Sequence, residues 1–111
     1  MEKVTMEYEP INAQQDISGQ DLYDALLLLK STDELDCFFK DLCTPQEIKA
    51  LAERWRVCKL LSKGELSYRE INSQTGVSLA TIGRVARFLH NEPHHGYQLV
   101  LNRMITTQIK K

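Results

Sequence analysis

The stretch of sequence that decides the fold runs from Ser67 to Leu89 and reads SYREINSQTGVSLATIGRVARFL. It predicts a helix, a tight turn and a second helix, because Gly76 can adopt the left-handed conformation that such a turn requires. Ile71 should point the first helix inward, and Val77 should close the corner. The predicted inward stripe of the second helix consists of Leu79, Ile82, Ala86 and Leu89.

The other face of the second helix is small, polar and basic. At 100° per residue, Ala80, Thr81, Arg84 and Phe88 fall on the side away from the inward stripe. Short and basic side chains at the start of a helix are typical of a recognition helix in the major groove of DNA. An αα-hairpin with a solvated outer face would fit the same pattern, so periodicity alone leaves both interpretations open.

The rest of the chain also has helical signals. Hydroxyl residues with an acid three positions later predict helix starts at Ser18 with Asp21, Ser31 with Glu34, Thr44 with Glu47 and Ser67 with Glu70. Apolar stripes follow the first three of these starts and mark one further helix: Leu22, Ala25, Leu26 and Leu29; Leu35, Phe38, Phe39 and Leu42; Ile48, Leu51, Trp55, Cys58 and Leu61; and Tyr97, Val100, Leu101, Met104 and Ile105. Gly64 should end the third helix, and Pro93 with Gly96 the fifth. No strand pattern interrupts them, so the predicted fold is all-α with six helices.

A chain of 111 residues has room for one small core. We expect a mobile arm over residues 1–16 and a helical domain over 17–111, with its helix-turn-helix at about 67–90. No apolar run approaches the length of a membrane span and no secretory signal follows Met1, which favours a cytoplasmic protein. The cysteines form no CxxC pair, so small buried hydrophobes are expected at Cys37, Cys43 and Cys58.

The net charge of −1 conceals two opposite halves. Eleven acids and three bases give −8 through Glu47, whereas eleven bases and four acids give +7 from Ile48 onward. The basic half suits an anionic partner, although two solvated surfaces that neutralise each other would have the same composition.

Four linked motifs carry a family resemblance: LCTPQE at residues 42–47, ALAERWRV at 50–57, GELSYREI at 64–71 and GVSLATIGR at 76–84. Together they resemble the tryptophan repressor superfamily, and most closely its YerC/YecD-like branch of small bacterial proteins, over residues from about 20 to 105. The resemblance implies an intertwined homodimer that presents two helix-turn-helix heads to a palindromic operator in double-stranded DNA. A short chain with three apolar helices before its helix-turn-helix would also bury more apolar surface in a shared dimer core than it could alone.

The resemblance also implies roles for single residues. Arg69 matches a position that reaches a guanine edge, Leu79 and Ala80 match the groove-facing start of the recognition helix, and Thr81 matches a phosphate contact. Gly83 departs from the pattern, because the repressor has a hydroxyl residue there, so the operator sequence should not be transferred. The full set of predicted DNA-binding residues is Lys63, Tyr68, Arg69, Ser78, Leu79, Ala80, Thr81, Gly83, Arg84 and Arg87.

A candidate effector pocket follows from the same resemblance. Thr44, Arg54 and Arg84 match the frame that holds tryptophan in the repressor. Val85 stands where the repressor has a glycine, and Phe88 where it has a serine that helps receive the ligand. Two large apolar side chains should fill the cavity and remove a polar partner, so tryptophan is not the expected effector.

Enzymatic and metal sites are not predicted. His90, His94 and His95 fall around Pro93 and Gly96, which favours a polar loop over a metal site. No nucleophile with a base and no phosphate loop is present in the sequence, and no cofactor is expected. Trp55 and Tyr97 are interpreted as core or dimer anchors. Two functions remain: a DNA-binding transcriptional regulator, and a protein-interaction module that kept the helix-turn-helix shape and docks a partner through Val85, Phe88 and the acidic first helices.

Overall fold

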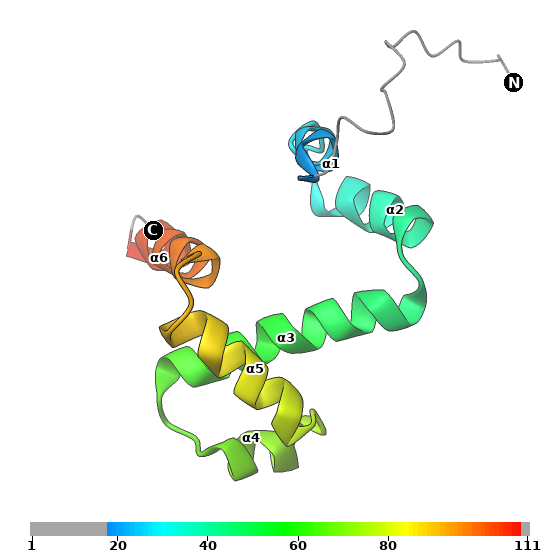
Figure 1. Ribbon diagram of the computed structural model, residues 1–111. Coiled ribbons are helices and arrows are strands. Elements are labelled where there is room, and N and C mark those ends of the chain that lie inside the picture. Colours follow the sequence, from blue (N-terminus) through cyan, green and yellow to red (C-terminus); the bar gives the residue numbers. More distant parts are fainter. Residues whose placement is uncertain (1–17, 110–111) are drawn as a thin grey trace, which may run out of the picture. The chain divides into compact units, whose positions relative to one another are not determined.

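The computed structural model describes residues 18–109, and the predicted arm over residues 1–16 lies outside this range. The described residues form helices and connecting turns without a strand, which confirms the all-α prediction. Their order along the chain (Figure 1) is α1 (Gln20–Leu26), α2 (Thr32–Leu42), α3 (Pro45–Lys63), α4 (Tyr68–Thr75), α5 (Leu79–His90) and α6 (Gly96–Ile109).

Two helix starts form as complete capping boxes. The Thr44 hydroxyl accepts a hydrogen bond from the Glu47 amide at 3.1 Å, and the Glu47 carboxylate accepts one from the Thr44 amide at 2.8 Å. Ser67 and Glu70 repeat this arrangement at 3.1 and 3.0 Å at the start of α4. These bonds satisfy backbone amides that the first turn leaves without helical partners, so the predicted starts of α3 and α4 are confirmed.

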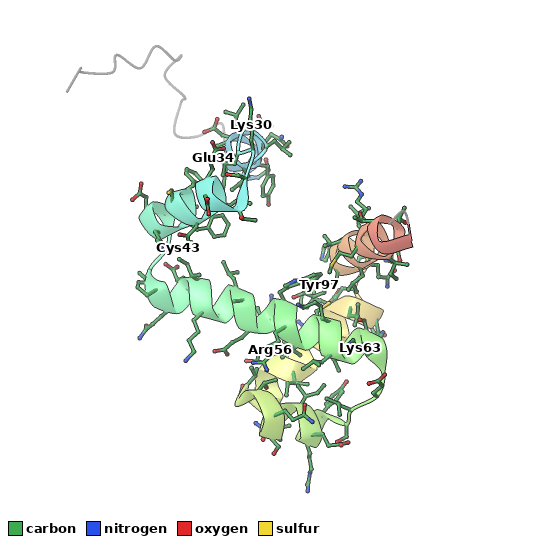
Figure 2. All side chains as sticks on the ribbon, turned by 180° about the vertical axis from the view of Figure 1, so that it is seen from behind. Lys30, Glu34, Cys43, Arg56, Lys63 and Tyr97 are labelled. Carbon is green, nitrogen blue, oxygen red and sulfur yellow. The ribbon has the colours of Figure 1, made fainter. Side chains whose placement is uncertain are left out.

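Other predicted boundaries differ in detail. Helix α1 has Gly19 as its N-cap, one residue after the predicted Ser18. At the start of α2, Ser31 accepts from the Glu34 amide as predicted, but the Glu34 carboxylate accepts at 2.7 Å from the amide of Lys30 (Figure 2).

The junction between α5 and α6 also differs from the prediction. Gly96 is the first residue of α6 and does not close α5. The left-handed residue before α6 is His95, with φ 58°, whereas glycine was expected to supply the turn. Two predicted stops, Gly64 after α3 and Gly76 after α4, do have left-handed φ values of 70° and 76°.

The described residues divide into two compact units, 18–42 and 43–109. In the first unit, the described helices α1 and α2 contain no buried residue. The predicted stripe residue Leu22 is 36% exposed, and Leu27 and Leu28 after α1 are 83% and 76% exposed. These apolar side chains therefore lack a core of their own within the described part of the first unit.

The second unit holds the core. Helix α5 packs against α3 and α4, and α6 follows and packs against α5 (Figure 1). The buried cluster consists of Val57, Cys58, Ile71, Val77, Ile82, Val85 and Leu89, with Ala86 also buried. Most of the predicted inward residues of the helix-turn-helix are thus confirmed.

Two sequence predictions about burial are wrong. Leu79 is 50% exposed, because it is the first residue of α5 and the core lies further along the helix. Of the cysteines expected inside, only Cys58 is buried, while Cys43 is half-buried and Cys37 is exposed. Burial raises the pKa of the Cys58 thiol, which keeps it protonated and unreactive.

Candidate nucleic-acid interface

The corner between α4 and α5 is tied by side-chain hydrogen bonds. The Asn72 side-chain amide donates to the Val77 carbonyl at 2.8 Å. The Thr75 hydroxyl donates to the Ile71 carbonyl at 2.6 Å and accepts from the Val77 amide at 3.1 Å. Together with Gly76 at φ 76°, these bonds fix how α5 leaves the turn. The sequence analysis assigned no role to Asn72, because this hydrogen bond depends on how the turn brings the Val77 carbonyl back to α4.

The start of α5 presents short side chains beside a capped helix end. Ser78 is the N-cap: its hydroxyl accepts from the Thr81 amide at 3.2 Å and donates to the Thr81 hydroxyl at 3.0 Å. Leu79 and Ala80 follow in the first turn, and both are exposed. The positive end of the helix dipole and small exposed residues favour approach of a negatively charged polymer.

The predicted DNA-binding residues are mostly accessible. Among them the exposed residues are Lys63, Tyr68, Arg69, Ser78, Leu79, Ala80, Arg84 and Arg87, whereas Thr81 and Gly83 are half-buried. Tyr68 and Arg69 lie at the start of α4, which packs against α5. Lys63 is the exception in placement: it ends α3 (Figure 2) and shares a cavity with Leu89 and His90, near the C-terminal end of α5.

Phe88 lies among charged and aromatic side chains. The guanidinium carbons of Arg84 and Arg87 lie 4.5 and 5.0 Å from the centre of its ring. The imidazole of His94 stacks on the ring with centroids 6.0 Å apart and an angle of 13° between the planes. Arg87 also pairs with Glu92, with Nε and Oε1 3.5 Å apart. The sequence placed Phe88 in an effector pocket and did not predict these contacts.

A cavity of about 510 Å³ lies where α3, α5 and α6 meet. Its lining residues are Trp55, Arg84, Val85, Phe88, His94, Gly96, Tyr97 and Val100. Three residues of the predicted effector pocket, Arg84, Val85 and Phe88, thus line one open volume. We expected Val85 and Phe88 to fill this space, but open volume remains beside them. Thr44 caps α3 and Arg54 is half-buried, and neither is among the lining residues.

Two aromatic residues of this cavity contact each other. The rings of Trp55 and Tyr97 are 6.4 Å apart at an angle of 31°, and both side chains pack against the core, in line with their predicted anchoring role. Burial raises the pKa of the Tyr97 hydroxyl, while the guanidiniums of Arg54 and Arg84 oppose the shift. Both arginines therefore act electrostatically on this wall of the cavity.

Residues 18–109 contain neither a candidate metal site nor a helix suited to span a membrane. No group of three or more histidine, cysteine or acidic side chains in this range could hold a metal ion. None of the helices there combines the length and apolar character that a membrane span needs.

Comparison with known proteins identifies the family. The model of the Trp repressor protein family matches residues 18–105. This chain belongs to the Trp repressor family. The uncharacterized protein YerC of Bacillus subtilis (strain 168) is 41% identical over 87 residues, which cover 78% of this chain and 82% of YerC.

Further members of the family are similar in structure and sequence. A TrpR-like protein from Eubacterium eligens ATCC 27750, solved by crystallography, is 39% identical, with a TM-score of 0.74 over 81% of this chain and 91% of that one. A Trp operon repressor homolog from Vibrio vulnificus (strain YJ016) is 45% identical over 49 residues, 44% of this chain and 48% of that protein. Over residues 18–109, the six-helix, Trp-repressor-like fold expected from the sequence motifs is therefore confirmed.

Proposed function

We propose that this Trp repressor family protein is a sequence-specific DNA-binding regulator of transcription that acts as a repressor. The observation that carries the proposal is the outer face of α4 and α5. There a tied helix-turn-helix corner, a capped helix start and exposed arginines occur together. The first turn of such a helix can enter the major groove, while guanidiniums bind phosphates and base edges.

The proposed roles divide by position. Arg69, Leu79, Ala80 and Gly83 lie nearest the bases, because they belong to the starts of the two motif helices or to the outer side of α5. The phosphate contacts come from Lys63, Tyr68, Ser78, Thr81, Arg84 and Arg87. Since Lys63 lies near the other end of α5, its contact would be with the outer flank of the site.

The functional unit in this proposal is a homodimer. Exposed apolar side chains support it: Leu27 and Leu28 after α1, and Leu99 and Ile105 on α6, are all more than half exposed. Large apolar side chains left in solvent favour association with a second copy of the chain, which would bury them. Analytical ultracentrifugation should give twice the chain mass at micromolar concentration. A folded monomer under these conditions would refute the dimer, because interlocked dimers seldom have a stable single subunit.

Tryptophan is not the effector in this proposal. The guanidinium carbon of Arg84 lies 4.5 Å from the centre of the Phe88 ring, so the chain's own aromatic ring already lies against Arg84. Calorimetric titration with millimolar tryptophan should therefore give no binding heat. A clear binding isotherm with the unmodified protein would mean that Phe88 leaves Arg84 to admit the ligand.

Two substitutions test the DNA-binding proposal. Arg69→Ala should cost about 1–3 kcal/mol of binding to a specific site and relax one base position, whereas Arg87→Ala should weaken all sequences about equally. Affinities are measured by fluorescence anisotropy on selected and random duplexes at several salt concentrations, since each phosphate contact steepens the salt dependence. Equal losses for both variants on both duplexes would exclude base readout by Arg69. Salt-insensitive capture of a protein without DNA binding would favour the interaction module.

A further inference from the structure

The arrangement around Phe88 is more specific than a solvated helix face requires. Arg84 lies one helical turn before Phe88 and Arg87 lies directly before it, and both guanidiniums lie within 5.0 Å of its ring centre. His94, from the segment after α5, stacks on the same ring. One half-buried phenyl ring thus touches both exposed arginines of α5 and the turn that follows.

Stacking leaves the arginines able to bind an anion. A guanidinium contacts an aromatic ring through its flat face, while its five N–H donors point outward in its own plane. The ring therefore does not compete with phosphate oxygens for the same part of the side chain. Arg87 pairs with Glu92 through its Nε, which lies 3.5 Å from Glu92 Oε1. The terminal nitrogens of Arg87 are thus left to bind a phosphate.

Holding a long side chain in place before binding has an energetic consequence. A free arginine loses rotamer freedom when it docks on DNA, and this loss subtracts from the affinity. A side chain already held against a ring has less freedom to lose. We propose that Phe88 is a positioning residue for DNA binding, whose ring holds Arg84 and Arg87 in the geometry that contacts the phosphate backbone. The inference rests on the proposed DNA-binding function.

Phe88 also forms part of the cavity wall beside Val85 and Tyr97, so its loss could act through packing alone. The two roles separate by chemistry. Leucine keeps an apolar side chain of moderate size but has no π face, whereas tyrosine keeps the ring and its cation–π contacts. A packing role predicts that both substitutions change the thermal stability, and a positioning role predicts that only leucine changes the DNA affinity.

The experiment compares Phe88→Leu with Phe88→Tyr by fluorescence anisotropy at fixed salt, on one duplex selected from a random DNA pool with the unmodified protein. Loss of two cation–π contacts should weaken binding by Phe88→Leu about tenfold, while Phe88→Tyr stays within about twofold of the unmodified protein. In a background carrying Arg84→Gln and Arg87→Gln, Phe88→Leu should have no further effect, because the side chains that it positions are gone. Equal affinity of Phe88→Leu and the unmodified protein, or an equal loss in both backgrounds, would overturn the inference.

A second readout separates this inference from the proposed function. In the free protein, the ring current of Phe88 should shift the side-chain Nε–Hε NMR signals of Arg84 and Arg87, and Phe88→Leu should remove these shifts. If the unmodified protein binds no DNA, the proposed function fails, and with it the positioning role in DNA binding. If it binds DNA but the arginine signals do not respond to Phe88→Leu, only the positioning role fails.

Discussion

The hydrogen bond from Asn72 to the Val77 carbonyl makes a quantitative prediction about the helix-turn-helix corner. Asn72→Ala removes the donor at 2.8 Å and leaves a carbonyl in a residue that is only 3% exposed. An unsatisfied buried carbonyl costs about 1–3 kcal/mol, and alanine returns about 0.5 kcal/mol through its higher helix propensity. The free energy of unfolding should therefore fall by about 0.5–2.5 kcal/mol.

Asn72→Asp is the sharper companion variant. A carboxylate has the same size as the amide but has no N–H to donate, so at neutral pH two acceptors would face each other and the loss should exceed that of Asn72→Ala. Urea unfolding of all three proteins should be compared at one protein concentration, because dimer stability depends on concentration. An Asn72→Ala protein as stable as the unmodified chain would refute the claim that this side chain ties the corner.

Three further predictions concern the same unit. Gly76→Ala should lose about 1–2 kcal/mol of stability, because an alanine backbone is strained at φ 76°. No neighbouring atom would clash with the added Cβ, so this backbone strain is the whole cost. Gly83→Ala should gain about 0.5–1 kcal/mol in thermal unfolding, since this helical position has open space, and a loss would contradict the reasoning. Hydrogen bonds from Ser67 lower the pKa of Glu70, so its contribution to stability is complete above the ordinary glutamate value and lost as the pH falls below it. Glu70→Gln should reduce the loss of unfolding free energy at acid pH. An unchanged loss would exclude this contribution of Glu70.

Local signals in the sequence predicted those parts of the fold that neighbouring residues decide. Thr44 and Ser67 cap helices with the acids three positions later, because both halves of a capping box lie within one turn. Gly76 takes the left-handed turn, and Ile71 and Ile82 are fully buried, as helical spacing around that turn requires.

Features that depend on contacts between elements could not be read from spacing. Leu79 fits the inward stripe by angle, but it begins α5 and meets no core there. The family resemblance predicts that Phe88 lines a pocket, which it does, but it does not predict the contacts of its ring with Arg84, Arg87 and His94. Rotamers decide which face of a helix a long side chain covers, and residue spacing does not report them.

Of the ten DNA-contact candidates that the sequence predicts, eight are exposed, whereas Thr81 and Gly83 are half-buried. The place of each candidate relative to α5 could not be predicted in the same way. Lys63 lies at the far end of α3, beside His90, a placement that no local pattern could give.

Sequence-specific DNA binding is tested most directly by selection of bound duplexes from a random DNA pool. Full-length protein is mixed with the pool at moderate salt, and the retained DNA is sequenced over several rounds. A dimeric, sequence-specific regulator should enrich a palindromic site whose half-sites are about one helical turn apart, and Arg69→Ala should lose that enrichment. A retained pool that stays random with the unmodified protein would contradict sequence-specific DNA binding.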